Sequence, residues 1–307
     1  MSNIPDYQTV MLPILKITAD DKEHSFREVV EILAHEYNLS DDERKELLPS
    51  GTQAIFDNRV GWAKTYLKKA GLISYPKRAF IKLTERGKNI LDEKPNRIDA
   101  KYLKRFEEFN EFQNLTNQDS NVTEHNEIVE YTDKTPEEVI ESAYQNMKKT
   151  LADELLEKIR NVEPAFFERL VVELLVKMGY GGSMKDAGRA IGKSGDEGID
   201  GTIKEDKLGL DIIYIQAKRW KDGNIVGRPE IQKFVGALAG QGAKKGIFIT
   251  ASSFSREALE YTPKNETKII MLDGNQLANL MIEYNLGVSI QQSYEIKKLD
   301  SDYFGDE

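Results

Sequence analysis

The fold is decided by two neighbouring stretches of sequence, GDEGIDGTI (195–203) and LDIIYIQAKRW (210–220). The second is a β-branched, aromatic run typical of a buried strand, and the first places Asp200 between glycines at the start of another strand. The charged, glycine-ended segment EDKLG (205–209) is typical of a turn. We therefore expect the two strands to lie side by side, with Asp200 near the second strand.

Three polar residues then converge at one edge of the predicted sheet. Residues two apart on a strand point to the same face, so Gln216 and Lys218 project together while the apolar residues between them face the core. A hard divalent cation such as Mg²⁺ prefers oxygen ligands, which Asp200, the amide of Gln216 and the backbone carbonyl of Ala217 can supply. Lys218 can hold a metal-activated water or stabilise charge on a phosphate, and Glu168 on the preceding helix can add a second carboxylate.

Each of these residues also has an ordinary structural interpretation. Asp200 can serve only to form the turn, Lys218 can be an edge lysine, and Glu168 can be a solvent-facing helix residue. The spacing alone is a weak signal, because mixed Asp, Gln and Lys triples are common in strands.

The segments around this pair complete an α/β domain with a mixed sheet. Two further buried strands are predicted, and the helices alternate with them along the chain. In order, the expected elements are a helix over 164–180, the two strands above, a helix over 228–241, a strand over 246–252, a short helix over 255–262, a strand over 268–274 and a helix over 275–287.

The absence of two residue types limits the chemistry of this domain. The chain has no cysteine, which excludes disulfides, thiolate nucleophiles and cysteine-bound metal centres and fits a cytoplasmic protein. Its three histidines are His24, His35 and His125, so none follows residue 125. A zinc hydrolase site or a histidine general base cannot be built there, which leaves carboxylates, lysine and an oxygen-bound metal.

The length of 307 residues suggests about two domains. Residues 1–95 alternate helices with a short strand pair, in the order of a winged helix. Ser25 is expected to cap one helix and Ser40 to start the next. A third helix, over 58–73, has an apolar stripe of Val60, Ala63, Leu67 and Ala70 and is expected to end at Gly71. Residues 96–135 are polar and acidic and are expected to form a linker. Residues 136–307 form the α/β domain, with a leading helix over 136–160. No apolar run is long enough to cross a membrane, and the N-terminus does not resemble a secretion signal.

The leading helix carries an apolar stripe that runs along its whole length. Three uses are open: the helix joins the two domains, pairs with a second copy of the chain, or packs into the core of the next domain, which is the simplest. The stripe consists of Ile140, Tyr144, Met147, Leu151, Leu155 and Ile159.

The first domain carries a local positive charge, although the whole chain has a net charge of −9. Residues 59–88 hold nine Lys and Arg and a single acid, Glu85. In a winged helix such residues surround the helix that enters the major groove of DNA, so this stretch is a candidate phosphate-binding surface. A solvated helix face, or a winged helix that binds protein, is the alternative. The candidate DNA contacts are Lys64, Lys68, Lys69, Lys77 and Arg78, with Arg228 at a helix start in the second domain.

Several motifs in this order resemble the Mrr family of type IV restriction endonucleases. They are GDEGIDG, YIQAKRW, GRPEIQKFVGALAGQ and KGIFITASSFS in the second domain and NRVGWAKTYLKKAGL in the first. The resemblance covers nearly the whole chain. It implies a restriction-endonuclease-like PD-(D/E)xK nuclease domain, an N-terminal winged helix, and Mg²⁺-dependent cleavage of modified DNA.

The resemblance also implies roles for individual residues. Asp200 matches the metal-binding aspartate of the family, Gln216 the position held by Glu or Gln, and Lys218 the catalytic lysine. Glu168 matches a helix glutamate often found at such sites. The chain departs from the family in having Glu197 where glycine is common, which we interpret as a replaced turn glycine rather than an added metal ligand.

The sequence therefore predicts an endonuclease that restricts methylated double-stranded DNA. Cleavage of both strands requires two active sites, so a homodimer or larger homo-oligomer is expected. Two other functions remain open: a repair nuclease acting on unmodified or branched DNA, and a DNA-binding regulator that has lost catalysis.

Overall fold

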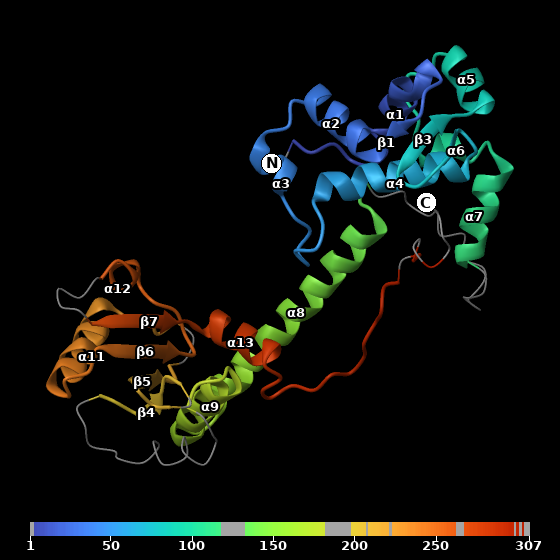
Figure 1. The fold of residues 1–307 in the computed structure, drawn as a ribbon. Coiled ribbons are helices and arrows are strands. Elements are labelled where there is room, and N and C mark those ends of the chain that lie inside the picture. Colours follow the sequence, from blue (N-terminus) through green and yellow to red (C-terminus); the bar gives the residue numbers. More distant parts are fainter. Residues whose placement is uncertain are drawn as a thin grey trace. The chain divides into compact units, whose positions relative to one another are not determined.

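The computed structural model describes residues 3–117, 133–181, 198–206, 208–220, 223–261, 267–297, 299–300 and 303 (Figure 1). The chain divides into two compact units. The first contains Met1–Tyr144 and Ile296–Glu307, and the second contains Gln145–Glu295. Within the described ranges, no helix is long and apolar enough to cross a membrane.

The first unit has the element order of a winged helix. Its three-stranded antiparallel sheet has the order β1-β3-β2, and α4 is the long helix that precedes the β2–β3 hairpin. The elements in chain order are α1 (Met11–Ile17), η1 (Thr18–Asp20), β1 (His24–Ser25), α2 (Phe26–Glu36), α3 (Asp41–Lys45), α4 (Ile55–Lys69), β2 (Ile73–Ser74), β3 (Phe80–Leu83) and α5 (Glu85–Asp92).

Local signals in the sequence explain where these helices begin and end. Ser25 and Ser40 each form a capping box with the glutamate three residues later, which fixes the starts of α2 and α3. Helix α4 is followed by Gly71, whose φ of 72° is the left-handed conformation that ends helices. The predicted helix caps and the predicted helix end at Gly71 are therefore present.

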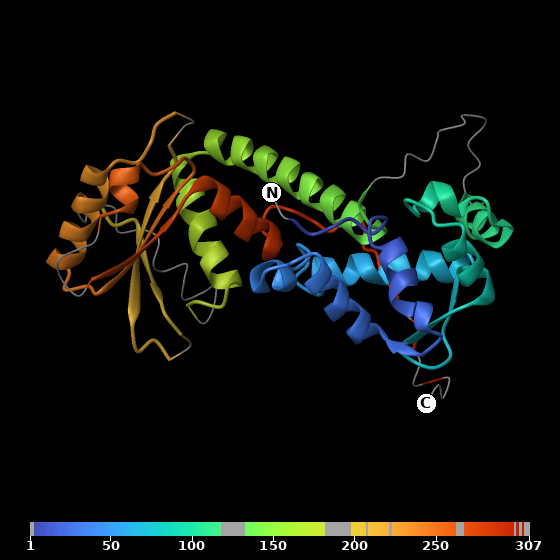
Figure 2. The same ribbon diagram turned by 90° about the horizontal axis from the view of Figure 1, so that it is seen from above.

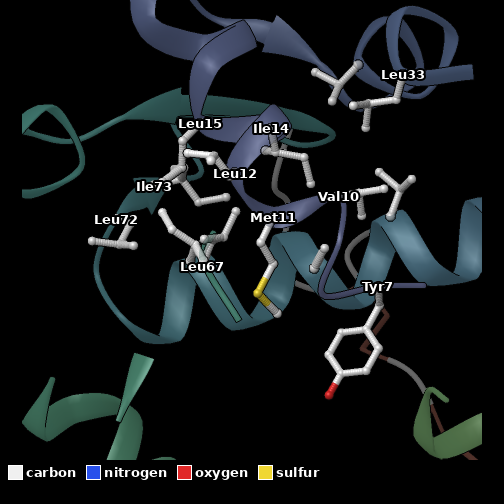
Figure 3. Packing of buried hydrophobic residues seen from close by; sticks show 14 of the residues in the cluster. Tyr7, Val10, Met11, Leu12, Ile14, Leu15, Leu33, Leu67, Leu72 and Ile73 are labelled. Atoms are coloured by element: carbon white, nitrogen blue, oxygen red, sulfur yellow. The ribbon is translucent and has the colours of Figure 1, made fainter. Parts of the chain in front are cut away.

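The core of the first unit forms where α1 packs against α2, α4 and the strands (Figure 3). The predicted apolar stripe of α4 faces this core, and all four of its members are completely buried: Val60, Ala63, Leu67 and Ala70. Figure 3 shows Met11 and Leu15 of α1 among the side chains that meet Leu67 and Ile73.

The expected linker over residues 96–135 is folded in its first half. It contains α6 (Ala100–Leu103) and α7 (Glu107–Asn117), and Ile98, Leu103 and Phe109 are completely buried in the core of the first unit. A few apolar residues are enough here, because they add to a core that other segments have already built. Residues 118–132 of the expected linker, including His125, lie outside the described residues.

The second unit is built on a four-stranded mixed sheet, as predicted, and helices cover both faces of the sheet. The strand order is β4-β5-β6-β7; the β4–β5 pair is antiparallel and the other two pairs are parallel. Figure 2 shows α9 and α13 on one face and α11 and α12 on the other. The elements are α9 (Pro164–Lys177), β4 (Gly201–Lys204), β5 (Ile212–Lys218), α11 (Arg228–Gly240), β6 (Lys245–Thr250), α12 (Arg256–Leu259), β7 (Lys268–Leu272) and α13 (Gly274–Glu283).

The predicted leading helix is α8 (Pro136–Asn161), and its two ends have different surroundings. Leu155 and Ile159 are buried in the core of the second unit, as the core-packing interpretation predicts. Ile140, Tyr144 and Met147 are exposed, so that interpretation does not extend to the first half of the stripe. Residues 136–144 of α8 instead belong to the first unit, which moves the division between the units from the expected residue 135 to Tyr144.

Candidate active site

The antiparallel β4–β5 hairpin places Asp200 beside Gln216. Gly201 is paired with Ile215, and the backbone N–H of Asp200 donates to the carbonyl of Ile215 at 2.9 Å. At the other end of the hairpin, the N–H of Glu205 donates to the carbonyl of Asp211 at 2.9 Å. The turn predicted from the sequence is therefore present, and it sets the register that brings the two predicted site residues together.

One oxygen of the Asp200 carboxylate is held by two donors. Oδ2 accepts a hydrogen bond from the side-chain Nε2 of Gln216 and another, at 2.7 Å, from the backbone N–H of Ala217. Gln216 is only 2% exposed, so its amide is fixed in this position. These two bonds fix the orientation of the carboxylate.

The structure gives the Gln216 amide a partner that the sequence analysis did not predict. Its Nε2 faces Asp200, because an oxygen there would meet the negative carboxylate, and its Oε1 is the atom that could serve as the expected metal ligand. Its Oε1 faces Gly198, where an added Cβ would lie only 3.1 Å from it. Gly198 has a φ of 108°, a backbone conformation that residues with a side chain rarely adopt. Glycine is therefore required here both by the backbone conformation and by the lack of space beside the amide.

Glu168 and Lys218 share the electrostatic environment of Asp200. Burial raises the pKa of Glu168 and the negative charge of Asp200 raises it further, while the ammonium group of Lys218 lowers it. Glu168 lies in the first half of α9, which packs against β4 and β5. Of the four residues predicted for the catalytic site, Asp200 and Gln216 are in direct contact and Lys218 lies two residues beyond Gln216 on the same strand, while Glu168 is near enough to feel the charges of Asp200 and Lys218.

The free oxygen atoms at this site fit a divalent cation. In the described part of the chain, Oδ1 of Asp200 and both carboxylate oxygens of Glu168 have no hydrogen bond or ion pair, and Lys218 has no ion-pair partner. No group of three or more His, Cys, Asp or Glu suited to a metal occurs among the described residues. Two carboxylates suit Mg²⁺, which keeps several waters and takes its remaining ligands from substrate phosphates. Glu197 lies outside the described residues.

The backbone of Lys218 is held by Thr250, a residue that the sequence analysis did not single out. Thr250 ends β6 directly beside Lys218, is completely buried, and donates from its hydroxyl to the carbonyl of Lys218 at 2.9 Å. The N–H groups of Ala251 and Trp220 donate to the same carbonyl at 3.2 and 2.8 Å. The sequence did contain a signal that could have identified Thr250, since it is a polar residue at the carboxyl end of a buried parallel strand.

Replacing Thr250 with valine is expected to slow catalysis without changing substrate binding. The variant Thr250→Val keeps the volume but removes the hydroxyl that fixes the end of β5, so Lys218 is less well positioned. We expect kcat to fall by about 10-fold with little change in KM, since small misplacements of catalytic groups are costly. Steady-state kinetics would measure this. Thr250→Ser should restore the rate, and equal kinetics for the valine variant and the wild type would contradict the role.

The basic residues predicted to bind DNA fall into two groups. Lys64 is half-buried, with Nζ 4.4 Å from the ring centre of Phe26 and 5.0 Å from that of Tyr75. Burial lowers its pKa, and the neighbouring Lys68 lowers it further. Lys64 therefore contributes to packing at the base of the hairpin more than to a solvent-facing charge.

The other basic residues are exposed. The Nζ of Lys68 lies 4.0 Å from the ring centre of Tyr75, and that of Lys69 lies 4.9 Å from the ring centre of Phe112. The remaining members lie at the β2–β3 hairpin and at the start of α11. Lys77 forms an ion pair with Glu23 at 2.9 Å, Arg78 is exposed, and the guanidinium of Arg228 stacks on Tyr261 at 5.2 Å.

The fold and the candidate site are those of a restriction-endonuclease-like nuclease domain that follows a winged helix in the sequence. The features that define it are the mixed sheet, Glu168 on its helix, and Asp200, Gln216 and Lys218 on the hairpin. Comparisons with known proteins agree. Residues 159–281 match the family model described as restriction endonuclease, and residues 7–93 match the Mrr N-terminal domain. The chain is 36% identical, over 98% of its length and 99% of the other protein's, to the type IV methyl-directed restriction enzyme EcoKMrr of Escherichia coli strain K12. The chain belongs to the Mrr family of restriction endonucleases.

Two solved structures are also similar in part. One is the DNA modification-dependent restriction endonuclease AspBHI, with 19% identity and a TM-score of 0.34 over 45% of this chain and 36% of the other. The second is the MspJI restriction endonuclease in complex with a 27-mer oligonucleotide, with 19% identity and a TM-score of 0.31 over 50% of this chain and 34% of the other. The match therefore spans about a third of each of those proteins.

Proposed function

We propose that this protein is an endonuclease that cleaves methylated double-stranded DNA by Mg²⁺-dependent phosphodiester hydrolysis. The observation that supports the proposal most is the contact of Asp200 with Gln216, two residues before Lys218, in a chain whose family contains a methyl-directed restriction enzyme. The charges of Asp200 and Lys218 both act on Glu168, which is consistent with a shared site. Restriction endonucleases of this kind generally use a divalent metal ion. Mg²⁺ is the ion that best suits two carboxylates and a phosphate substrate.

The residues of the site divide the work of hydrolysis. Asp200 and Glu168 would hold a divalent cation, which would supply a Lewis acid and an acidified water. Gln216 and the N–H of Ala217 hold the Asp200 carboxylate in one orientation. The ammonium group of Lys218 stabilises the negative charge that develops on the phosphate and orients the attacking water. Thr250 fixes the strand end on which Lys218 lies.

A comparison of two copies of one plasmid tests the proposed substrate. Purified protein is incubated with Mg²⁺ and with the plasmid in methylated and unmethylated form, and Asp200→Asn protein is the control for contaminating nucleases. Selective cleavage of the methylated copy is the expected result. Equal cleavage of both copies would indicate a repair-type nuclease instead, and binding without cleavage would indicate a regulator.

Cleavage of both DNA strands requires two copies of the site. We infer that the active form is a homodimer or a larger homo-oligomer, since each chain carries one such site. Sedimentation of the protein bound to a short methylated duplex is expected to give two or more chains per duplex.

The exposed lysines of the first unit are expected to supply phosphate contacts. Replacing Lys68, Lys69 and Lys77 together with alanine should weaken binding to all DNA sequences. Each lost phosphate contact should reduce the slope of log K against log salt by about 0.9, so the triple variant should lose about 2 to 3. Binding titrations at several salt concentrations measure the slope.

A matched triple variant controls for the change in total charge. Lys16, Lys45 and Lys101 are exposed lysines on other helices of the same unit, and their replacement removes the same charge. We expect the slope of log K against log salt for this control variant to remain close to that of the wild type. Equal losses in the two triple variants would remove these three lysines from the DNA-binding surface.

Replacing Gln216 with glutamate is expected to make stability depend on the metal. The variant Gln216→Glu places a second buried negative charge against Asp200, which destabilises the metal-free protein. A bound cation offsets this repulsion and stabilises the folded state by mass action. Thermal unfolding should show a lower Tm in chelator and a larger Mg²⁺-induced rise than in the wild type. An identical response to Mg²⁺ in both proteins would contradict the proposed position of the cation.

A further inference from the structure

The beginning of the outward face of α4 is covered, although α4 occupies the position of the groove-entering helix in a winged helix. The core-facing stripe of α4 includes Val60 and Ala63. At 100° per residue, Asn58 and Trp62 lie on the opposite side, where DNA would approach. Asn58 is nevertheless only 3% exposed. On the side of α4 that should meet DNA bases, Asn58 is therefore buried and Trp62 is half-buried.

The start of α8 covers this face, and this contact lies within the first unit (Figure 1). Thr135, which caps α8 and is completely buried, donates from its hydroxyl to Oδ1 of Asn58 at 2.6 Å. The indole N–H of Trp62 donates to the carboxylate of Glu137.

Glu138 holds the flank of the same face through Arg59. The guanidinium of Arg59 donates to Oε1 of Glu138 at 2.7 Å through Nη2, and to both carboxylate oxygens at 3.2 and 3.3 Å through Nε. The same guanidinium donates from Nη1 to the backbone carbonyls of Ile4 and Pro5 at 2.7 and 3.2 Å. Arg59 thus donates hydrogen bonds both to Glu138 and to two backbone carbonyls, and Glu138 is the only one of these partners that carries a negative charge.

The chemistry of this contact resembles that of a DNA complex. Two carboxylates accept hydrogen bonds from a guanidinium and from an indole N–H. The same two donors could bind phosphate oxygens or the acceptor atoms of DNA bases. The contact is polar and confined to one turn, because the next apolar residues of α8, Val139 and Ile140, are exposed rather than packed. Small polar contacts of this kind are typical of interfaces that open.

We propose that the face of α4 formed by Asn58, Arg59 and Trp62 is a DNA-binding surface that the first turn of α8 keeps closed. DNA and the acidic turn compete for the same donors, so binding of DNA displaces Thr135, Glu137 and Glu138 from α4. The inference rests on the proposed function, since it assumes that the first unit binds DNA. It adds a surface distinct from the exposed lysines, and it assigns to α8 the role of an internal competitor.

A reversible cross-link tests the proposal, because the chain has no cysteine of its own. The double variant Asn58→Cys, Thr135→Cys introduces two thiols where the wild-type side-chain oxygens are 2.6 Å apart. Oxidation should lock the turn of α8 on α4 and lower DNA affinity by about 10-fold or more relative to the reduced form of the same protein. The two single variants, treated with the same oxidant, should show no change. A Tm that is not lowered by oxidation verifies that the locked protein is folded.

Charge variants of α8 give an independent measurement. Replacing Glu137 and Glu138 with glutamine should raise DNA affinity several-fold more than the same replacement of Glu154 and Glu157, two exposed glutamates of the same helix. If neither the cross-link nor the replacement of Glu137 and Glu138 changes the affinity for DNA, the inference is wrong, while the proposed function still holds. The absence of DNA binding in every form of the protein would contradict the proposed function, and the inference with it.

Discussion

Replacing Asp200 with asparagine is expected to lower the rate of DNA cleavage by about three orders of magnitude. The substitution keeps the shape of the side chain and an oxygen that can accept from the N–H of Ala217. It removes the negative charge that would hold a cation, and loss of several kcal/mol of charge stabilisation in the transition state corresponds to this change in rate. Single-turnover cleavage of methylated plasmid measures it.

The control for Asp200→Asn is the same substitution at Asp153, an exposed residue of α8. Asp153→Asn should cleave at the wild-type rate. Asp200→Asn should still bind DNA, because the candidate phosphate contacts lie on other residues. If Asp200→Asn cleaves as fast as the wild type, the hydrolytic site lies elsewhere in the chain.

Replacing Lys218 with methionine should lower the cleavage rate by about two to three orders of magnitude. Methionine preserves the length and the apolar stem of the side chain, so the packing at the end of β5 is retained. The ammonium group that balances Glu168 and Asp200 is lost, and with it the stabilisation of negative charge on the reacting phosphate. Rates at saturating DNA and Mg²⁺ isolate this effect from changes in binding.

Lys204→Met is the matched control for Lys218→Met, since Lys204 is an exposed lysine on the same hairpin. The double variant Asp200→Asn, Lys218→Met should be little slower than Asp200→Asn alone, because residues that act as one unit give non-additive effects. Fully multiplicative losses would indicate that the two residues act in separate steps.

The sequence was sufficient to predict the hairpin that carries the site. Side chains in strands alternate with a period of two, so Gln216 and Lys218 could be placed on one face, and the charged turn after β4 brought Asp200 beside them. The same local reasoning predicted the buried stripe of α4 and the cap at Ser25. These features could be predicted because they depend on interactions between residues that are close together in the sequence.

Contacts between distant segments could not be predicted in this way. Thr135 meets Asn58 across 77 positions of sequence, and no local pattern shows that the start of α8 packs on α4. The orientation of the Gln216 amide depends on the carboxylate beside it, and the contribution of Thr250 depends on which strand lies next to β5. In the expected linker, the burial of Phe109 depends on a core formed by other parts of the chain.

The position of the metal ion in a DNA complex tests the account most directly. Crystals of the protein with a methylated duplex and Mn²⁺, which resembles Mg²⁺ in its preference for oxygen ligands, would reveal the ion by its anomalous scattering. We predict a peak about 2.0 to 2.2 Å from a carboxylate oxygen of Asp200, with a DNA phosphate as another ligand and Lys218 beside that phosphate. A metal peak bound to other residues, with Asp200 contacting neither the ion nor the DNA, would contradict it.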